Sequence, residues 1–494
     1  MNPALTGLAR RGPDRLAADP SRVVTMLFVP GQEGFDHHDS RSAAVVARIL
    51  ALSEDEVQRG FDDVVARFGH RHRDLVGTFD RHANELADRL DPGSGLSATR
   101  RLLLGATFTS EFALEGAALC NPSIVAHPDQ SGAPRGSLRF VMSVRAIGEG
   151  HRSTIGFRTG LVDAEGGIVV DAPSPLATKG APEAVPFDAA VFRGELSRLG
   201  IGGENADFVL DALGEAFTES DLAEQLGRLG SQLATRRHAA SIIPVMQKIA
   251  ERTYGVRFAA DTSLTERTLV PEMAAENSGL EDARFVRFEH DGRPPTYYAT
   301  YTAYSGTDIG QQLLETSDFA FFTSSPIVGP AAANKGLALF PRKISGRYAA
   351  LSRSDRESNS IAFSDNPLHW DTAMACQTPT RSWEAVQLGN CGSPIETTAG
   401  WLVLTHGVGP MRTYSIGAIM LDLEDPTRVL GRLREPLLSP APDEQDGYVP
   451  NVVYSCGALV HRDTLVLPYG IGDGAIGLAT VSMPALLDAL DTGD

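Results

Sequence analysis

The sequence predicts a mainly β protein: a five-bladed β-propeller with an α-helical domain before it and a helical insertion after its first blade. Three observations predict this fold. They are five repeated pairs of strands, a helical stretch near the N-terminus, and a second helical stretch between the first and second repeats. Small strand units that recur at a fixed period are typical of radial arrays of sheets.

Each repeat is a β-rich run, a polar turn and a second strand that opens with Ile-Gly or Ile-Ala. The first second strand begins at Ile155. The other four begin at Ile309, Ile361, Ile416 and Ile476, and so recur every 52 to 60 residues. The upstream partner strands are expected at 138–145, 296–304, 347–353, 401–406 and 464–469. A propeller brings the loops of all its blades to a common axis, so distant residues can share one site.

The helical parts flank the first repeat. Residues 1–115 form the predicted N-terminal helical extension, in which 1–22 is a polar, poorly ordered lead-in and 23–29 a short strand. Ser53 and Glu56 make a capping box, followed by apolar residues at helical spacing. Residues 116–485 form the predicted propeller domain, interrupted by a helical insertion at about 186–255. For both helical parts, stability or dimerisation is favoured over catalysis.

Composition restricts the class of protein. The chain has 494 residues and a formal net charge of −18, which argues against nucleic acid or an anionic membrane as the main partner. Its four cysteines form no C-x-x-C pair, which is typical of reduced thiols in a cytoplasmic protein. The N-terminus lacks a continuous apolar signal region, and no apolar run is long enough to span a bilayer. We therefore expect a cytoplasmic protein without a membrane partner.

Four clusters of polar residues lie where strands end in turns. The first cluster, Glu281-Asp282-Ala283-Arg284, directly precedes a strand. Its acid, held by the neighbouring arginine, could be a catalytic carboxyl; alternatively, it is a turn aspartate that makes only local backbone hydrogen bonds. Lys335, with Arg353 on a following strand, suits an anion or sugar site, although solvated surface charge competes as an explanation.

The third and fourth clusters come later in the chain. Glu396 precedes the strand that opens at Trp401 and ends at His406, and it is a candidate base. Tyr469-Gly-Ile-Gly-Asp473 places an acid between glycines, which is weak evidence alone because glycines commonly make turns. All four clusters share one register within the repeats, so we expect them at one end of the channel. Two carboxylates there could cleave a glycosidic bond by acid and base catalysis.

No Walker loop, no G-x-S-x-G elbow and no placed G-x-G-x-x-G occurs in the sequence. Nucleotide chemistry and a serine hydrolase mechanism therefore lack support. No metal and no cofactor is expected, apart from inorganic phosphate as a co-substrate if the protein is a phosphorylase.

In combination, the motifs resemble glycoside hydrolase family 130, whose members are five-bladed propellers that act on β-mannosides by phosphorolysis or hydrolysis. The resemblance covers about 121–481. It rests on Asn121-Pro-Ser-Ile, Glu281-Asp-Ala-Arg284, Leu339-Phe-Pro-Arg-Lys-Ile344, Gly392-Ser-Pro-Ile-Glu396-Thr with Gly400-Trp-Leu and His406-Gly407, and Tyr469-Gly-x-Gly-Asp473. The N-terminal helical part is similar to that of the longer members.

The resemblance implies roles for individual residues. Asp282 matches the catalytic acid, which protonates the leaving oxygen through a hydroxyl of the bound mannose. Asp473 and Arg145 match residues that hold the sugar, and Arg353 matches an arginine of the phosphate site. Arg284, His406 and Tyr469 are further candidates for substrate binding. Lys335 lies near the position of an Arg-Asn pair, which is a departure from the family pattern.

A second departure decides which reaction the sequence favours. Glu396 stands where phosphorolytic members usually carry lysine. A carboxylate there changes the local charge by two units against a phosphate of about −1.5 to −2, and one unit pair at about 4 Å is worth roughly 4 kcal/mol at a dielectric near 20. The first hypothesis is therefore an inverting β-mannosidase acting on β-1,2-linked manno-oligosaccharides, with Asp282 as acid and Glu396 as base.

Two alternatives stay open. A β-mannoside phosphorylase would release mannose 1-phosphate and use Lys335 and Arg353 to bind phosphate. A propeller that binds glycans without catalysis is the third hypothesis, because fold alone does not determine function. The expected partner in each case is a manno-oligosaccharide, and the helical parts could support a homo-oligomer.

Overall fold

The computed structural model describes residues 7–31, 40–86, 95–201, 203–232, 236 and 239–490, and the protein is mainly β. The chain divides into two compact units. The main unit comprises Met1–Ala18, Ala117–Pro173 and Gly180–Asp494, and the minor unit comprises Asp19–Gly116 and Ser174–Lys179. The first strand of the chain thus belongs to the same unit as the last.

All five expected strand pairs form, each as an antiparallel hairpin. They are β5 (Leu138–Ile147) with β6 (Ser153–Val162), β15 (Arg293–Tyr304) with β16 (Ile309–Thr316), β19 (Tyr348–Ser352) with β20 (Asn359–Ser364), β24 (Gly400–Val408) with β25 (Tyr414–Leu421), and β29 (Thr464–Ile471) with β30 (Ala475–Ser482). Four of the five signature isoleucines are buried, whereas Ile309 is 47% exposed. In four of the five hairpins, the repeat therefore marks a buried position near the start of the second strand.

Further strands extend these hairpins into sheets. β4 (Ala118–Ala126) pairs with β5, and β7 (Ile168–Val170) and β13 (Arg267–Leu269) pair with β6. A parallel contact of β6 with β14 (Gly279–His290) continues the sheet through β15, β16, β17 (Phe321–Pro326), β12 (Tyr254–Arg257) and β9 (Ala181–Glu183).

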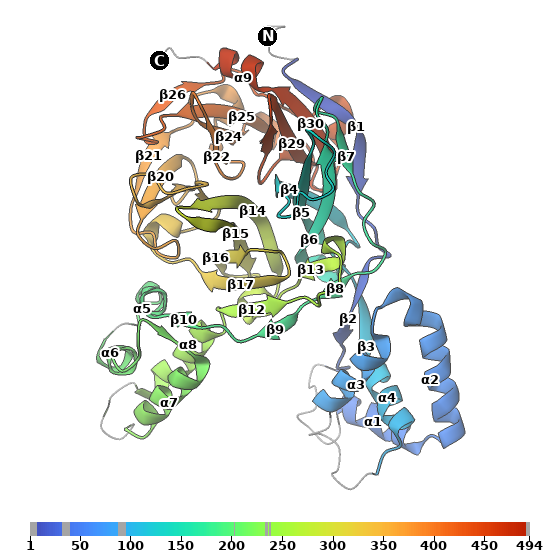
Figure 1. Cartoon of the computed structure of the whole chain (residues 1–494). Helices are drawn as coiled ribbons and strands as arrows, with labels where there is room; N and C mark the ends of the chain where they lie inside the picture. The colour runs from blue at the N-terminus through green and yellow to red at the C-terminus, as the bar shows by residue number, and fades with distance from the viewer. Residues whose placement is uncertain are drawn as a thin grey trace. The chain divides into compact units, whose positions relative to one another are not determined.

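Three smaller sheets follow. One runs β18 (Ala338–Leu339), β19, β20, β21 (Ala373–Gln377), and the next runs β22 (Gln387–Asn390), β24, β25, β26 (Val429–Arg432), with β23 (Ile395–Thr397) on β24. The last runs β1 (Ala9–Ala17), β30, β29, β27 (Val453–Tyr454), with β28 (Leu459–His461) on β29. Within the main unit, the sheets follow one another around a common centre (Figure 1).

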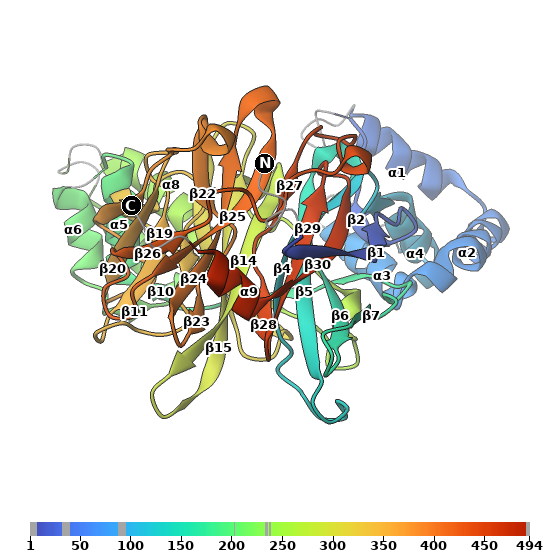
Figure 2. The same ribbon diagram turned by 90° about the horizontal axis from the view of Figure 1, so that it is seen from above.

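The position of β1 corrects the expectation of a poorly ordered lead-in. Residues 9–17 form an edge strand that pairs with β30 from Ala9–Val481 to Ala17–Ala475, with an irregularity between Arg11 and Arg15 (Figure 2). Pro13 lies in this irregular stretch, and an edge strand tolerates proline because its outer N–H groups need no partner in the sheet. The sequence pattern did not predict this strand because the segment is rich in charged residues.

The described residues of the minor unit form four α-helices: α1 (Arg41–Ala51), α2 (Glu54–Phe68), α3 (Leu75–Glu85) and α4 (Ala98–Thr107). The predicted capping box at the start of α2 is present, because Ser53 accepts from the Glu56 N–H and Glu56 accepts from the Ser53 N–H. Two strands, β2 (Val23–Leu27) and β3 (Thr109–Ala113), pair with each other. Within this unit Leu86, Leu104 and Phe108 form a buried cluster.

A second group of helices belongs to the main unit and lies between β9 and β12 in the chain. It comprises α5 (Ala189–Arg198), α6 (Glu204–Leu210), α7 (Glu219–Gly230) and α8 (Ala239–Ala250), with a short pair of strands, β10 (Phe187–Asp188) and β11 (Ala216–Phe217). These elements share their own apolar core, which includes Phe192, Leu229 and Met246. A last helix, α9 (Met483–Ala489), follows β30. Among the described residues, no helix has the length and apolar character needed to cross a bilayer.

Candidate active site

Seven of the nine predicted site residues line one cavity of about 200 Å³ in the main unit. They are Arg145, Asp282, Arg284, Lys335, Arg353, His406 and Asp473. These residues come from four of the hairpins, from β14 and from the loop before β18, so segments that are distant in the sequence meet at this cavity. The cavity is the size of a small polar ligand.

The backbone around this cavity is unusual. Asn121, Asp282, Arg412 and Asp473 all line it, and all four have a left-handed backbone with φ between 48° and 55°. Asn121 and Asp282 lie at irregularities in the pairing of β4 with β5 and of β14 with β15, and Asp473 lies in the turn between β29 and β30. Such conformations cost energy in residues other than glycine and concentrate at functional sites.

Asp282 is held at the centre of a buried polar network. Asn121 Nδ2 donates to its carboxylate at 2.7 Å, and an Arg145 Nη atom lies 3.4 Å from the same oxygen. Arg145 also bonds Glu281 at 2.6 Å, and the other Glu281 oxygen accepts from Lys335 Nζ at 2.5 Å. Glu281 thus fixes two of the cations that surround Asp282.

The two acids in the cavity differ in ionisation. Burial raises the pKa of the Asp282 carboxyl, but the charges of Arg145, Arg284 and Lys335 outweigh burial, and the pKa lies below its ordinary value. Burial, followed by the nearby Asp282 carboxylate, raises the pKa of Asp473 to about 6. One carboxylate is therefore stabilised as an anion, and its neighbour holds a proton more readily.

A second group of side chains forms a cationic side of the cavity. Arg284 donates to the Tyr454 hydroxyl at 2.7 Å, and the ring centroids of Tyr454 and His406 lie 5.0 Å apart. Gly389 leaves room for the side chains of His406 and Arg353, because a Cβ at this position would lie 2.5 Å from His406 Cε1 and 2.8 Å from Arg353 Cδ. The Nε atoms of Arg284 and Arg353 are buried and have no hydrogen-bond partner among the described residues.

His406 is neutral in this setting. Its Nδ1 lies 3.1 Å from the carbonyl oxygen of Asn390, so Nδ1 carries the hydrogen and Nε2 is left as an acceptor. Burial, followed by the charge of Arg353, lowers the pKa of His406 to about 3. The imidazole therefore contributes a lone pair and no positive charge.

Charge is unbalanced across the cavity. Five cations line it, Arg145, Arg284, Lys335, Arg353 and Arg412, whereas Asp282 and Asp473 are its acids. With Glu281 behind Arg145 and Lys335, the sum is five positive charges against three negative ones. The site has a surplus of about two positive charges and suits a dianion.

Glu396, the expected base, lies outside this group. It is on β23 and pairs with Trp401, five residues from His406 along β24, which is about 17 Å of extended strand. Its carboxylate binds the Arg342 guanidinium at 2.7 Å and is 43% exposed. Two carboxyls of an inverting hydrolase are expected about 6.5–9.5 Å apart, so the geometry gives no support to Glu396 as the base.

Tyr469 also lies away from the cavity. Its hydroxyl donates to Glu444 at 2.7 Å, and Glu444 in turn accepts from Arg11 of β1. The side chain is 2% exposed and packs in the core of the last sheet. Tyr469 is linked to Arg11 of β1 through Glu444, and it is not among the described residues that line the cavity.

Several lining residues were not assigned a role from the sequence. They are Asn121, Gln387, Arg412, Tyr414, Val449, Val452 and Tyr454. Asn121 opens one of the family motifs, which was a usable signal. Arg412 and Tyr454 carry no local pattern, because only the folding of loops from different hairpins brings them to the cavity.

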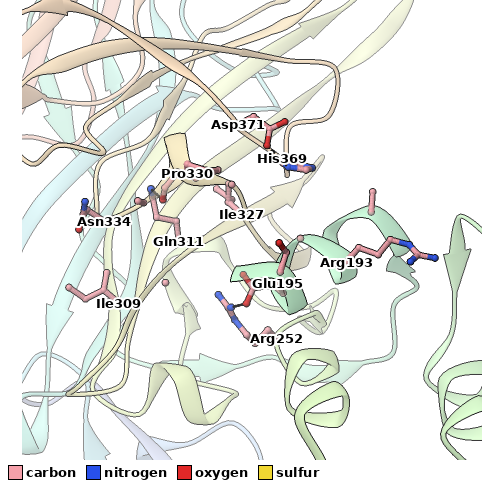
Figure 3. A pocket seen from close by; sticks show the side chains of 17 residues that line it. Arg193, Glu195, Arg252, Ile309, Gln311, Ile327, Pro330, Asn334, His369 and Asp371 are labelled. Carbon is pink, nitrogen blue, oxygen red and sulfur yellow. Dashed lines mark hydrogen bonds and ion pairs between the residues drawn. The ribbon is translucent and has the colours of Figure 1, made fainter. Parts of the chain in front are cut away.

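A larger cavity of about 930 Å³ lies elsewhere in the main unit, between α5 and the loops around β16 and β17 (Figure 3). None of the predicted site residues lines it. Its walls are largely apolar, and Glu195 and Arg252 form an ion pair within it. The smaller cavity is the better candidate for chemistry because it gathers two carboxylates together with arginines whose buried Nε atoms have no hydrogen-bond partner among the described residues. Within the described residues, no group of histidine, cysteine and acidic side chains could hold a metal ion.

Comparison with known proteins identifies the class as carbohydrate-active enzymes. Residues 234–492 match the model of glycoside hydrolase family 130, described as beta-1,4-mannooligosaccharide phosphorylase. The chain belongs to this family.

Individual relatives agree with this assignment. A 1,2-beta-oligomannan phosphorylase of Thermoanaerobacter sp. is 38% identical over 216 residues, which is 43% of this chain and 71% of the relative. A beta-1,2-mannobiose phosphorylase of Listeria innocua is 32% identical over 230 residues, 45% of this chain and 63% of the relative. A solved structure of a beta-1,2-mannobiose phosphorylase from Listeria innocua is 20% identical and matches with a TM-score of 0.43. The match covers 77% of this chain and 93% of that one, and its TM-score is too low to support an argument.

Proposed function

We propose that the protein is a β-mannoside phosphorylase, which transfers the terminal mannose of β-1,2-linked manno-oligosaccharides to inorganic phosphate. The observation that carries the proposal is the surplus of positive charge in the cavity, with buried Arg284 and Arg353 donors that lack a partner among the described residues. The names of the most similar relatives support phosphorolysis and the β-1,2 linkage. Phosphorolysis is therefore proposed in place of hydrolysis, which the sequence alone favoured.

The proposed architecture is a five-bladed β-propeller whose axis passes through the site. Two blades are β4 to β7 and β14 to β17, joined edge to edge, and three are the separate smaller sheets. Support comes from the five hairpins, the arrangement of the sheets around a common centre, and the pairing of β1 with β30, which would close the ring. Residues 1–115 and 186–255 are then a helical extension and an insertion.

In the proposed reaction, a phosphate oxygen attacks the anomeric carbon as the bond from that carbon to the leaving oxygen breaks. The product is mannose 1-phosphate with inverted configuration, and the leaving oxygen takes up a proton. Asp282 supplies this proton through a mannose hydroxyl. Asp473 and Arg145, which line the same cavity, hold the sugar against Asp282.

Phosphate itself prepares the acid. Without ligand, the surrounding cations keep the pKa of Asp282 low, which suits an anion and not a proton donor. A phosphate dianion near Arg284 and Arg353 neutralises part of that charge, and a negative charge near a carboxyl raises its pKa. Binding of the second substrate therefore favours the protonated form of Asp282 that the reaction needs.

His406 suits a partly protonated phosphate. Hydrogen phosphate carries one O–H group at neutral pH, and the Nε2 lone pair of a neutral imidazole can accept from it. Arg284, Arg353 and the Tyr454 hydroxyl offer donors to the other oxygens. Lys335 is already paired with Glu281 at 2.5 Å, so the phosphate role falls mainly on the two arginines.

The test measures products with and without phosphate. Incubation with β-1,2- and β-1,4-mannobiose is expected to yield mannose 1-phosphate only when phosphate is present, with the β-1,2 isomer preferred. Arg353→Ala should raise the KM for phosphate at least tenfold, since it removes a charged hydrogen-bond donor, with little change in KM for the sugar. Release of free mannose at an equal rate without phosphate would show hydrolysis instead.

A glycan-binding propeller without catalysis predicts a different result. In that case neither product forms, and Asp282→Asn leaves sugar binding intact. Asp282→Asn is expected to abolish turnover of the phosphorylase while phosphate still binds, which calorimetry can measure.

A further inference from the structure

A second cavity shares a wall with the proposed active site. It has a volume of about 530 Å³, within the range of ligand-binding cavities. The wall is the segment 409–415, which comprises the turn after β24 and the first two residues of β25. Arg412 and Tyr414 line the active-site cavity, whereas Thr413 and Ser415 line the second one. In the extended part of the segment, the side chains of Thr413 and Ser415 lie on the opposite face from that of Tyr414, as the two-residue period of a strand requires.

Trp383 forms the apolar side of the second cavity. Its ring lies against two glycines of the neighbouring strands, because a Cβ on Gly407 or Gly417 would come within 2.4 or 2.6 Å of ring carbons of Trp383. The indole N–H donates to the Arg434 carbonyl at 3.2 Å. Trp383 is only partly buried and lines the cavity, so its ring presents a flat apolar surface to a ligand.

Polar groups suited to hydroxyls surround the ring. Glu435 is exposed, and its carboxylate makes no hydrogen bond or ion pair within the described part of the chain. The Ser382 and Thr413 hydroxyls line the cavity and are likewise without a partner there. The single cation, Arg11, is already bound to Glu444 at 3.0 Å. An anion is therefore disfavoured, and a neutral ligand that offers hydroxyl donors is favoured.

We propose that this cavity is a second glycan-binding site, which holds pyranose units of a manno-oligosaccharide. A pyranose has an apolar face of C–H groups that can pack on an indole, and an edge of hydroxyls that can donate to a carboxylate. The identity of the sugar rests on the proposed function, whereas the site itself rests on Trp383 and Glu435. Its occupant would lie next to the catalytic cavity and keep a long substrate close to it.

The fluorescence of the protein offers a direct test. Trp370 and Trp401, the two other tryptophans, are fully buried, so acrylamide should quench Trp383 alone. Trp383→Phe should remove the quenchable fraction, which confirms the assignment. A β-1,2-manno-oligosaccharide is expected to protect Trp383 from acrylamide in the intact protein.

Variants separate this site from the catalytic one. Glu435→Gln should weaken the protecting affinity about tenfold, as expected for loss of a charged hydrogen bond, and leave kcat/KM on mannobiose unchanged. Glu424→Gln, at an exposed turn between β25 and β26, is the matched control and should change neither. Asp473→Asn, which removes a sugar contact from the catalytic cavity, should leave Trp383 protection intact.

Three results would overturn the proposal: no protection of Trp383, equal protection in Glu435→Gln, or loss of protection in Asp473→Asn. The last would show that the signal comes from the catalytic cavity. Absence of mannose 1-phosphate together with protected Trp383 would overturn the proposed function alone and leave the glycan site standing.

Discussion

Asp282 and Asp473 show how a single cavity can hold two carboxyl groups in different states. Asp282 lies among Arg145, Arg284 and Lys335, which favour its anion, while burial and the Asp282 charge disfavour the anion of Asp473. The two groups are chemically identical. Their different pKa values follow from their surroundings alone.

The raised pKa of Asp473 implies a cost in stability at neutral pH. A group whose pKa is higher in the folded state than in the unfolded state stabilises the fold at low pH, and that contribution is lost as pH rises through about 6. Asp473→Asn removes the cost and tolerates the left-handed backbone. We expect the free energy of unfolding to rise by about 2 kcal/mol at pH 7.5 and to change little at pH 4.

Urea unfolding at the two pH values measures this effect. A gain in stability at pH 7.5 should coincide with a large loss of sugar binding, because the proposed function uses the same carboxylate to bind the sugar. Equal stability of the variant and the parent at pH 7.5 would contradict the prediction.

Gly389 offers a test of the cationic side of the cavity. Gly389→Ala would place a Cβ against His406 and Arg353, and one of them must move. We expect the KM for phosphate to rise about tenfold or more, with a smaller effect on the KM for mannobiose. Gly227→Ala on α7 is the control, since a Cβ there meets nothing within 4 Å and activity should be unchanged.

The outcome at Glu396 shows the limit of reading a site from the sequence. The change from lysine to glutamate in the motif suggested a base, because the sequence gives the residue type but not the direction of the strand. In the structure β23 pairs with the Trp401 end of β24, and His406 lies at the other end. By contrast, Asp282 and Arg284 are two residues apart on β14, at an irregularity in its pairing with β15. Residues so close in the chain reach the same cavity together.

At the scale of elements, β1 depends on one buried carboxylate. Arg11 binds Glu444, which is 1% exposed and also accepts from Tyr469. Arg11→Ala leaves Glu444 buried without its cation and is expected to lower the free energy of unfolding by about 2 kcal/mol, less than for a fully buried pair because Arg11 is partly exposed.

Arg15 on the same strand provides the control for this prediction. Its pair with Asp443 is exposed on both sides, at 44% and 72%, so Arg15→Ala should cost less than about 1 kcal/mol. Urea denaturation of both variants gives the comparison. Equal losses would show that burial of Glu444 does not matter.

Hairpins were the elements most reliably predicted. Each second strand has isoleucine followed by glycine or alanine at or near its start, after a polar turn. Both partners of each hairpin lie close in the chain, so the local pattern is enough to predict them. β1 could not be found this way, because its partner β30 is distant in the sequence and four of its own nine residues are charged. Likewise, β3 follows α4 directly and was hidden in a stretch of helical pattern.

At the scale of the whole molecule, each compact unit has its own core. Phe108 is fully buried in the minor unit, and Phe140 is fully buried in the main unit. Phe108→Ala and Phe140→Ala should each lower the free energy of unfolding of the unit that contains the residue by about 3–5 kcal/mol. We expect calorimetry to show two transitions, with each variant lowering a different one.

Activity distinguishes the two units further. Phe108→Ala should leave kcat/KM for mannobiose unchanged at 25 °C, because no residue of the catalytic cavity belongs to the minor unit. Phe140→Ala should reduce the temperature at which activity is lost. A single transition shifted by both variants would show instead that the units unfold together.

The pairing of β1 with β30 also concerns how the protein is made. A ribosome releases β1 early, yet the strand that completes its hydrogen bonds emerges only when translation of the last sheet is nearly over. Until then, β1 has no partner strand for its backbone hydrogen bonds. Asp473 lies in the turn of the hairpin that contains β30, so the strand that pairs with β1 and the last acid of the cavity are synthesised together.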